Sequence, residues 1–309
     1  MNFLANKRYN SYLEYMKRKH GKRIQKVTVD AGFTCPNRDG LLGSNGCIYC
    51  NNASFNPGYN SAKISISAQI EAGIEFLQRR YGSEHYIVYF QPYSNTYAPL
   101  EQLKKIYEEA LSQPHVVGLT IGTRPDCVDE EILNYLAGLS ETYDITVEYG
   151  LESTSDQTLQ KINRCHDFQC YLDAVHLTAS LKLKQCTHLI LGFPWEDKSH
   201  WLNEAEILSS LPIDFLKIHQ LHIVKETPLG NMYMNNPFPL LTFPEYLDLI
   251  IAFLERLNPE IVIQRLAGEA PPHMLIAPHW GMRASEIVRR IETEMVLRDT
   301  WQGKMYQNK

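Results

Sequence analysis

Six short runs of β-branched and aromatic residues alternate with amphipathic helical patterns along the first two thirds of the chain. The runs span residues 26–30, 86–90, 116–122, 145–150, 187–192 and 215–221. The segments between them carry apolar residues at helical spacing, for example Ile66, Ile70 and Ile74. Parallel strands need crossover helices of this kind, and right-handed crossovers curl such a sheet into a full or partial barrel. The sequence therefore predicts an α/β fold, a partial TIM-like (β/α)6 barrel with additions at both ends.

The additions divide the chain of 309 residues into three predicted parts. We expect a basic N-terminal extension over residues 1–25, the barrel core over residues 26–230, and a C-terminal extension over residues 231–309 that packs on the barrel. No internal repeat or low-complexity tract is visible, so we expect one barrel-like domain and not two independent ones.

The C-terminal third carries its own signals. The Pro- and Asn-rich segment 226–246 predicts a long loop. Near its end, Thr242 and Glu245 predict a capping box that begins a helix. Residues 261–268 are a candidate for a further strand, and residues 284–298 predict a final helix.

The first 26 residues concentrate positive charge. They hold eight Lys or Arg residues against one acid, Glu14, which gives them +7 and leaves −12 for the rest of a chain whose net charge is −5. Tyr9, Tyr12 and Tyr15 interleave with the basic residues. Two interpretations stay open. The segment is either an arm that binds a polyanion such as nucleic acid, with tyrosines stacking on bases, or an amphipathic helix whose apolar face docks on the barrel.

The cysteine content predicts a reducing location. Seven cysteines is an odd number, and a disulfide framework is not expected at this chain length. Four of them are scattered and receive no role from the sequence: Cys127, Cys165, Cys170 and Cys186. The first ten residues lack the apolar core of a signal peptide, and the apolar run 247–254 is too short to cross a bilayer. We expect a cytoplasmic protein with no membrane partner.

The remaining cysteines, Cys35, Cys47 and Cys50, lie within sixteen residues directly after the first predicted strand. In a parallel barrel this places them at the C-terminal rim, where active sites lie. A structural zinc is one interpretation, but it needs a fourth ligand, for which His20 is a candidate. A four-iron cluster held by three thiolates is another, and it leaves one iron open for a cofactor. A glycine-rich loop with incidental cysteines is the third.

The segment Cys47-Ile48-Tyr49-Cys50 resembles the second half of the Cys-x3-Cys-x-aromatic-Cys signature of the radical S-adenosylmethionine (SAM) superfamily. The first gap has eleven residues, which is typical of the branch related to the radical domain of the Elongator catalytic subunit. Over roughly residues 20–280 the chain is similar to the YhcC/YtqA-type proteins, and residues 217–229 are a strong match. The resemblance implies a radical SAM barrel in which Cys35 and this segment hold a [4Fe-4S] cluster. SAM bound to the open iron would yield a 5′-deoxyadenosyl radical that removes a hydrogen atom from the substrate.

The resemblance also implies cofactor contacts at successive strand ends. Tyr49 would pack beside the adenine. Gln91, Pro92 and Tyr93 occupy the place of the motif that meets the methionine amino group. No catalytic acid or base is identified.

Further along, Glu152 and Ser153 would face the ribose, and Arg164 would pair with the methionine carboxylate through its guanidinium fork. Cys165 stands where Elongator-like proteins usually have Gly. Structural interpretations remain for other motif residues. Arg124 with Asp126 fits a surface ion pair of little energetic value, and three histidines fit hydrogen-bonded core positions as well as ligands: His188, His219 and His222.

The resemblance implies a tRNA substrate, because Elongator-like radical proteins modify the wobble uridine. We expect a change to the side chain on C5 of that base, such as conversion of carboxymethylaminomethyl to aminomethyl. tRNA and a flavodoxin or ferredoxin electron donor are the expected partners. Two alternatives stay open: a radical SAM enzyme that acts on a small metabolite or peptide, and a non-catalytic, metal-stapled RNA-binding protein.

Overall fold

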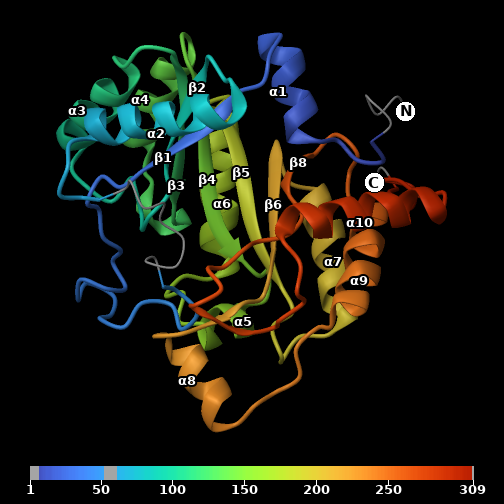
Figure 1. Cartoon of the computed structure of the whole chain (residues 1–309). Helices are drawn as coiled ribbons and strands as arrows, with labels where there is room; N and C mark the ends of the chain where they lie inside the picture. Colours follow the sequence, from blue (N-terminus) through green and yellow to red (C-terminus); the bar gives the residue numbers. More distant parts are fainter. Residues whose placement is uncertain (1–6, 52–60, 308–309) are drawn as a thin grey trace.

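A curled parallel sheet forms the centre of the molecule (Figure 1). The computed structural model describes residues 7–51 and 61–307. Within them the sheet has seven strands in the order β1-β2-β3-β4-β5-β6-β8, and every neighbouring pair is parallel. The strands are β1 Gln25–Val29, β2 Tyr86–Phe90, β3 Val116–Thr123, β4 Asp144–Glu152, β5 Lys184–Leu191, β6 Phe215–Gln220 and β8 Val262–Arg265. The predicted α/β partial barrel is confirmed, and the candidate strand at 261–268 supplies the seventh strand.

Helices connect the strands and cover the outer face of the sheet (Figure 1). Between strands lie α2 Ile66–Tyr81, α3 Leu100–Leu111, a 3-10 turn at Pro125–Cys127, α4 Glu130–Ser140, α5 Asp156–Lys161, α6 Phe168–Ser180 and α7 Lys198–Ser209. Five of these helices begin at a Ser or Asp side chain that accepts a backbone N–H of the first turn: Ser65, Asp129, Ser155, Asp167 and Asp197. Such caps satisfy amide groups that the helix itself leaves unpaired. In the described part of the chain, every helix is too short or too polar to span a bilayer.

The C-terminal segment adds α8 Pro228–Asn235, α9 Phe243–Arg256 and α10 Ala284–Leu297, and β9 Leu275–Ala277 pairs antiparallel with β7 Ile223–Val224. The capping box at the start of α9 is confirmed. The prediction of one long loop over 226–246 is wrong, because α8 lies inside it. The Thr227 hydroxyl accepts the N–H of Gly230, and Pro228 occupies the first turn. This start signal outweighs the loop-like composition that follows it.

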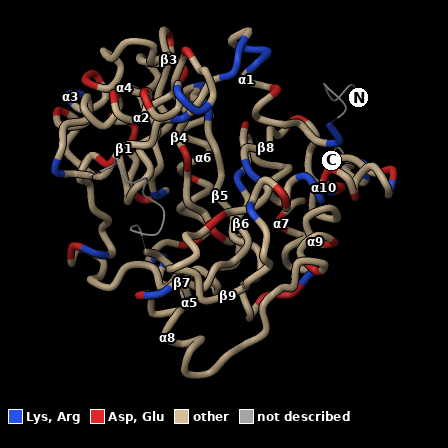
Figure 2. The backbone as a smooth tube through the Cα atoms, viewed as in Figure 1, with Lys and Arg blue, Asp and Glu red and all other residues tan. Residues whose placement is uncertain are grey.

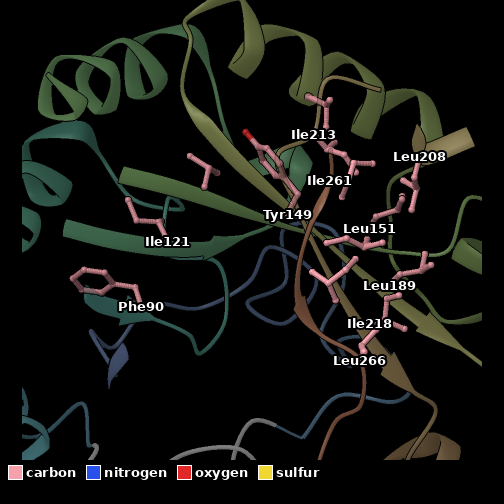
Figure 3. Close-up of a cluster of buried hydrophobic side chains, with 14 of the residues drawn as sticks. Phe90, Ile121, Tyr149, Leu151, Leu189, Leu208, Ile213, Ile218, Ile261 and Leu266 are labelled. Atoms are coloured by element: carbon pink, nitrogen blue, oxygen red, sulfur yellow. The ribbon is translucent and has the colours of Figure 1, made fainter. Parts of the chain in front are cut away.

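Along each strand, successive side chains point alternately to an apolar outer face and to a polar inner face of the sheet. Side chains on the outer face form the main apolar core beneath the helices; Figure 3 labels Phe90, Ile121, Tyr149, Leu189 and Ile218 among them. Their strand neighbours point to the other side of the sheet, because successive side chains alternate. These neighbours include Tyr89, Glu148, His188 and Lys217, which line a cavity inside the curl. The period of two therefore places a polar interior behind strands whose composition is mostly apolar.

Glu148 is the centre of a buried ion cluster in this interior. Its side chain is fully buried, and its carboxylate accepts from Lys26 Nζ at 2.7 Å and from Lys217 Nζ at 2.8 Å. His188 Nε2 lies 2.8 Å from the same carboxylate. Burial favours the neutral acid, but Lys217 and Lys26 outweigh it and hold the pKa of Glu148 well below its usual range. Burial lowers the pKa of His188 to about 4, so this ring is neutral and donates its Nε2–H to Glu148.

The basic N-terminal segment docks as helix α1 Tyr12–His20 against the N-terminal edge of the sheet (Figures 1 and 2). The rings of Tyr12 and Tyr15 meet Phe215, the first residue of β6, edge-on at 5.5 and 5.3 Å between centroids. With Cys186 and Val262 they close the bottom of the barrel. Six of the eight basic residues pair with acids: Lys7, Arg8, Lys17, Lys19, Lys22 and Lys26. The docked-helix interpretation is therefore the one the contacts support.

Replacing Glu148 by Gln should destabilise the fold by about 3 kcal/mol, because it leaves two lysine ammonium groups beside an amide that cannot balance their charge. Urea unfolding followed by circular dichroism measures the change. Glu84→Gln is the matched control, since the Glu84 side chain is 70% exposed where it pairs with Lys22. The control should keep the wild-type midpoint. Equal midpoints for both variants would contradict the importance of the ion cluster.

Candidate functional site

The three clustered cysteines line one cavity at the C-terminal edge of the sheet. Cys35 Sγ lies 3.2 Å from Ser94 Oγ, which belongs to the loop after β2. Cys47 is buried, and its sulfur accepts hydrogen bonds at 3.4 Å from Asn37 Nδ2 and from Arg164 Nη1. Polar donors therefore already surround the sulfur atoms, as an anionic metal–thiolate centre requires.

A second chain segment holds the cysteine loop in place. The Ile48 N–H donates to Ile162 O at 3.1 Å, and Asn163 Nδ2 donates to Gly46 O at 2.6 Å. Asn37 Nδ2 donates in the other direction, to Asn163 O at 3.1 Å. Gly46 has φ of +68°, and a Cβ there would lie 2.7 Å from Arg38 Nε, so only glycine fits this turn. The cysteines are thus positioned by contacts that cross more than a hundred residues of sequence.

The spacing of the three sulfur atoms does not suit one small ion. A tetrahedral zinc with 2.3 Å bonds would bring its sulfur ligands to about 3.8 Å from one another. Across the described residues, the single group of three Cys, His, Asp or Glu ligand atoms that all lie within 4.8 Å is Glu148, Cys186 and His188. The Cys35, Cys47 and Cys50 sulfurs are therefore more widely spaced, as expected where each thiolate binds a different iron. His20, the candidate fourth zinc ligand, instead bonds Asp144 at the opposite edge of the sheet.

The Glu148, Cys186 and His188 group is itself an ion-pair cluster. Both oxygens of Glu148 are engaged by Lys26 and Lys217, and two ammonium groups would repel a cation there.

Most of the residues predicted to contact the cofactor line the same cavity: Tyr49, Gln91, Tyr93, Glu152 and Arg164. Pro92 and Ser153 do not. The Pro92 carbonyl accepts from Asn95 Nδ2 at 2.9 Å, and the Ser153 hydroxyl donates to Glu196 Oε1 at 2.7 Å. The ribose contact therefore stays a prediction for Glu152, whose carboxylate lies near Tyr49 in the cavity lining.

Two buried guanidinium groups face the cavity with unused hydrogen-bond capacity. Arg124 is 2% exposed and binds Asp126 through two hydrogen bonds of 2.8 and 2.7 Å, so this pair is not a surface pair. Arg124 Nη2 also donates to Arg164 O at 2.7 Å. Within the described residues, Arg124 Nη1 and Arg164 Nε have no partner. Buried donors of this kind call for an anionic ligand, and a carboxylate or a negatively charged cluster supplies one.

The loops behind the site contain residues whose importance the sequence did not reveal. Asn95 is fully buried, and its Nδ2 donates to the carbonyls of Phe90, Pro92 and Gly122, which ties the end of β2 to the end of β3. Its position inside the loop 91–97 was visible, but its partner Gly122 lies 27 residues away in sequence. The three histidines expected to be core residues or ligands, His188, His219 and His222, all line the cavity.

The one departure from the Elongator-like pattern has a backbone reason. Cys165 has φ of +60°, a left-handed conformation in which glycine carries no steric penalty. Its neighbour Asn163 has φ of +57°. The position therefore keeps the conformation that glycine favours although the residue differs, and Arg164 between them still reaches Cys47.

Comparison with known proteins shows the family. The profile of the Radical SAM superfamily matches residues 42–208, and that of the Radical SAM C-terminal domain matches residues 213–296. The match supports an enzyme over a non-catalytic RNA-binding protein. Members of this family bind a [4Fe-4S] cluster and SAM, and that Cys35, Cys47 and Cys50 hold the cluster here stays a prediction.

Two relatives match most of the chain. YtqA of Bacillus subtilis is 33% identical over 301 residues, 97% of this chain and 94% of YtqA. YhcC of Escherichia coli is 35% identical over 266 residues, 86% of this chain and 85% of YhcC.

More distant matches lie in the Elongator group. The tRNA uridine(34) acetyltransferase of Methanocaldococcus infernus is 26% identical over 182 residues, 57% of this chain and 33% of that protein. The solved structure of an N-terminally truncated Elp3 from the same organism superposes with a TM-score of 0.68 at 18% identity, over 90% of this chain and 64% of that one. With the three thiols gathered at the rim of a parallel partial barrel, these matches identify the chain as a member of the radical SAM superfamily, on its YhcC/YtqA-type branch.

Proposed function

We propose that this radical SAM enzyme modifies the C5 side chain of the wobble uridine of tRNA, for example by converting carboxymethylaminomethyl to aminomethyl. The observation that carries the proposal is the similarity to a tRNA uridine(34) acetyltransferase over 57% of the chain. The likeness to the Elp3 structure supports a shared fold. A single base of an anticodon loop is unpaired and enters a cavity of this kind without melting a duplex.

Within the proposal, Cys35, Cys47 and Cys50 hold the [4Fe-4S] cluster. Cluster and SAM together supply a 5′-deoxyadenosyl radical that removes a hydrogen atom from the substrate. Arg164 donates to Cys47 and offers its Nε–H to the methionine carboxylate. Tyr49 and Glu152, which both line the cavity, bind the adenosine part.

Two cation–aromatic pairs on the rim fit an RNA ligand. The Arg38 guanidinium lies 5.9 Å from the centroid of the Tyr93 ring, and Lys161 Nζ lies 5.3 Å from that of Trp195. Arg38, Tyr93 and Trp195 lie in loops that follow the C-terminal ends of strands, and Lys161 is the last residue of α5. Aromatic faces stack on unpaired bases while the cations meet phosphates. The predicted basic arm is not part of this surface, since α1 lies at the other edge of the sheet.

Electron supply and location complete the proposal. A flavodoxin or ferredoxin is the expected reductant, because breaking the carbon–sulfur bond of SAM consumes one electron. All seven cysteines are free of disulfides, which agrees with the reducing, cytoplasmic location expected from the sequence.

A small metabolite or peptide is the alternative substrate. The position of α1 favours it, because the most basic segment of the chain lies away from the cavity. With such a substrate the cluster and cofactor chemistry stay the same, and SAM cleavage does not depend on tRNA.

Replacing Cys47 by Ala should abolish both cluster retention and SAM cleavage, because two thiolates cannot hold the cluster that cleavage needs. Iron and sulfide content, visible absorption and 5′-deoxyadenosine release after anaerobic purification report the result. Cys170→Ala is the matched control, since Cys170 lies on α6 outside the cavity lining, and it should keep both properties. Cleavage at the wild-type rate in Cys47→Ala would show that the ligand assignment is wrong.

Release of 5′-deoxyadenosine should rise when tRNA from cells lacking the gene is added, and much less with tRNA from wild-type cells, whose target is already modified. Mass spectrometry of the digested nucleosides should show the change at one wobble uridine. Binding should weaken steeply with salt. If neither tRNA preparation changes the rate of SAM cleavage, and the nucleosides from the two strains are identical, the metabolite or peptide alternative is favoured.

A further inference from the structure

The cavity continues past the cysteines into the barrel, and its inner wall is cationic. Glu148 lies four residues before the end of β4, about 13 Å deeper than the strand end at the rim. Lys217 on β6 pairs in register with His188 on β5 and with Arg265 on β8. All four side chains line the cavity. The inner half of the cavity is therefore built from the centres of the last strands and not from loops.

The positive charge of this wall exceeds its negative charge. Lys217 and Arg265 are cationic, Glu148 is the one carboxylate in this part of the wall, and Lys26 pairs with Glu148 from outside the lining. Both oxygens of Glu148 are already used: Oε1 by Lys26, and Oε2 by Lys217 and His188. No carboxylate in residues 7–51 and 61–307 forms a salt bridge with Arg265. Its side-chain contact is Nη1 donating to His219 Nε2 at 3.4 Å. The Arg265 guanidinium thus keeps most of its donors for a ligand.

Hydrogen bonds fasten the segment that follows Arg265. Gln220 forms a pair of hydrogen bonds with the backbone of Gly268: the Gly268 N–H donates to Oε1 at 2.8 Å, and Nε2 donates to Gly268 O at 3.1 Å. This pair fastens the segment after β8 onto β6. A Cβ at Gly268 would lie 2.6 Å from His219 Nδ1, so the glycine lets the imidazole approach the backbone closely. His219, which accepts from Arg265, is thereby placed beside the end of β8.

We propose that Arg265, beside His219, binds a carboxylate of the substrate in the wall of the cavity, with Lys217 adding to the positive potential. The proposal rests on the proposed function and specifies its substrate: a wobble uridine whose C5 side chain ends in a carboxylate. A guanidinium fork matches the two oxygens of that group. Arg265 is the last residue of β8, the strand at the edge of the sheet, and it is exposed, so a ligand group reaches it from solvent.

The first experiment tests the anion site without RNA. The reconstituted holoenzyme is treated anaerobically with the arginine reagent phenylglyoxal, in malonate or in its neutral analogue malonamide, at matched ionic strength. Mass spectrometry follows the modification of Arg265 and of Arg79, an exposed arginine paired with Glu75 on α2. Malonate should slow the modification of Arg265 and leave Arg79 unchanged. Equal rates for Arg265 in malonate and malonamide would overturn the carboxylate site.

The second experiment tests the substrate class. Two anticodon stem-loops carry either 5-carboxymethylaminomethyluridine or its neutral carboxamide at the wobble position. Arg265→Gln should weaken binding of the carboxylate stem-loop about ten- to a hundred-fold, and binding of the carboxamide by less than about two-fold. Arg79→Gln, the control, should change neither. Equal losses for both stem-loops would overturn the assignment of Arg265.

The two experiments separate the proposals. If malonate protects Arg265 and the wild-type enzyme binds neither stem-loop, the carboxylate site stands and the tRNA substrate is wrong. If both stem-loops bind the wild type equally and malonate gives no protection, the tRNA substrate stands and the carboxylate site is wrong.

Discussion

The hydrogen bonds between the cysteine loop and the turn at Ile162–Arg164 are the constraint on which the site depends. The cysteine loop contains no helix or strand between Cys35 and Cys50, and its internal turn hydrogen bonds, such as Cys50 N–H to Cys47 O at 3.1 Å, do not tie it to the rest of the site. Ile48, Asn163 and Asn37 supply the contacts that do. The same turn carries Arg164, whose guanidinium reaches Cys47. Cluster ligands and the proposed carboxylate partner are therefore positioned by one set of interactions, and a change in either segment moves both.

The parallel sheet makes those interactions possible. Because every strand runs the same way, the loops after β1, β2, β4 and β5 meet at one edge, and helix α1 closes the other edge with Tyr12 and Tyr15. The alternation of side chains then divides each strand between an apolar outer face and a polar inner face. The buried cluster around Glu148 follows from this division: charges that would be costly in the outer core compensate one another inside the curl.

Much of this was predictable from local sequence patterns. The strands of the partial barrel, the capping box of α9 and the shared location of the cysteines depend on periodicity, on caps and on chain direction, all of which lie within a few neighbouring residues. The helix α8 was missed because the composition after Pro228 suggested a loop, although the Thr-Pro start was present. The polar inner face of the sheet was only partly predictable. Lys217 and His219 alternate with other residues within one strand, but the residues that they contact lie on other strands.

Long-range partners explain the remaining differences. Ser153 was expected at the ribose, yet its hydroxyl bonds Glu196, which lies 43 residues away in sequence. Arg124 fitted a surface pair, and its burial depends on the later segment that contains Arg164. The basic N-terminal residues suggested a polyanion site, but acids from distant parts of the chain pair with half of them: Glu292, Asp299, Asp144 and Glu84. No pattern within a short window specifies which acid meets which base.

The central claim is that three thiolates leave one iron of the cluster open and that SAM occupies it. Electron–nuclear double resonance of the reduced, anaerobically purified enzyme tests this directly, using SAM labelled with ¹⁵N in its amino group and ¹⁷O in its carboxylate. The account predicts hyperfine coupling of the cluster spin to both labels. Bound SAM without coupling to either label would contradict it.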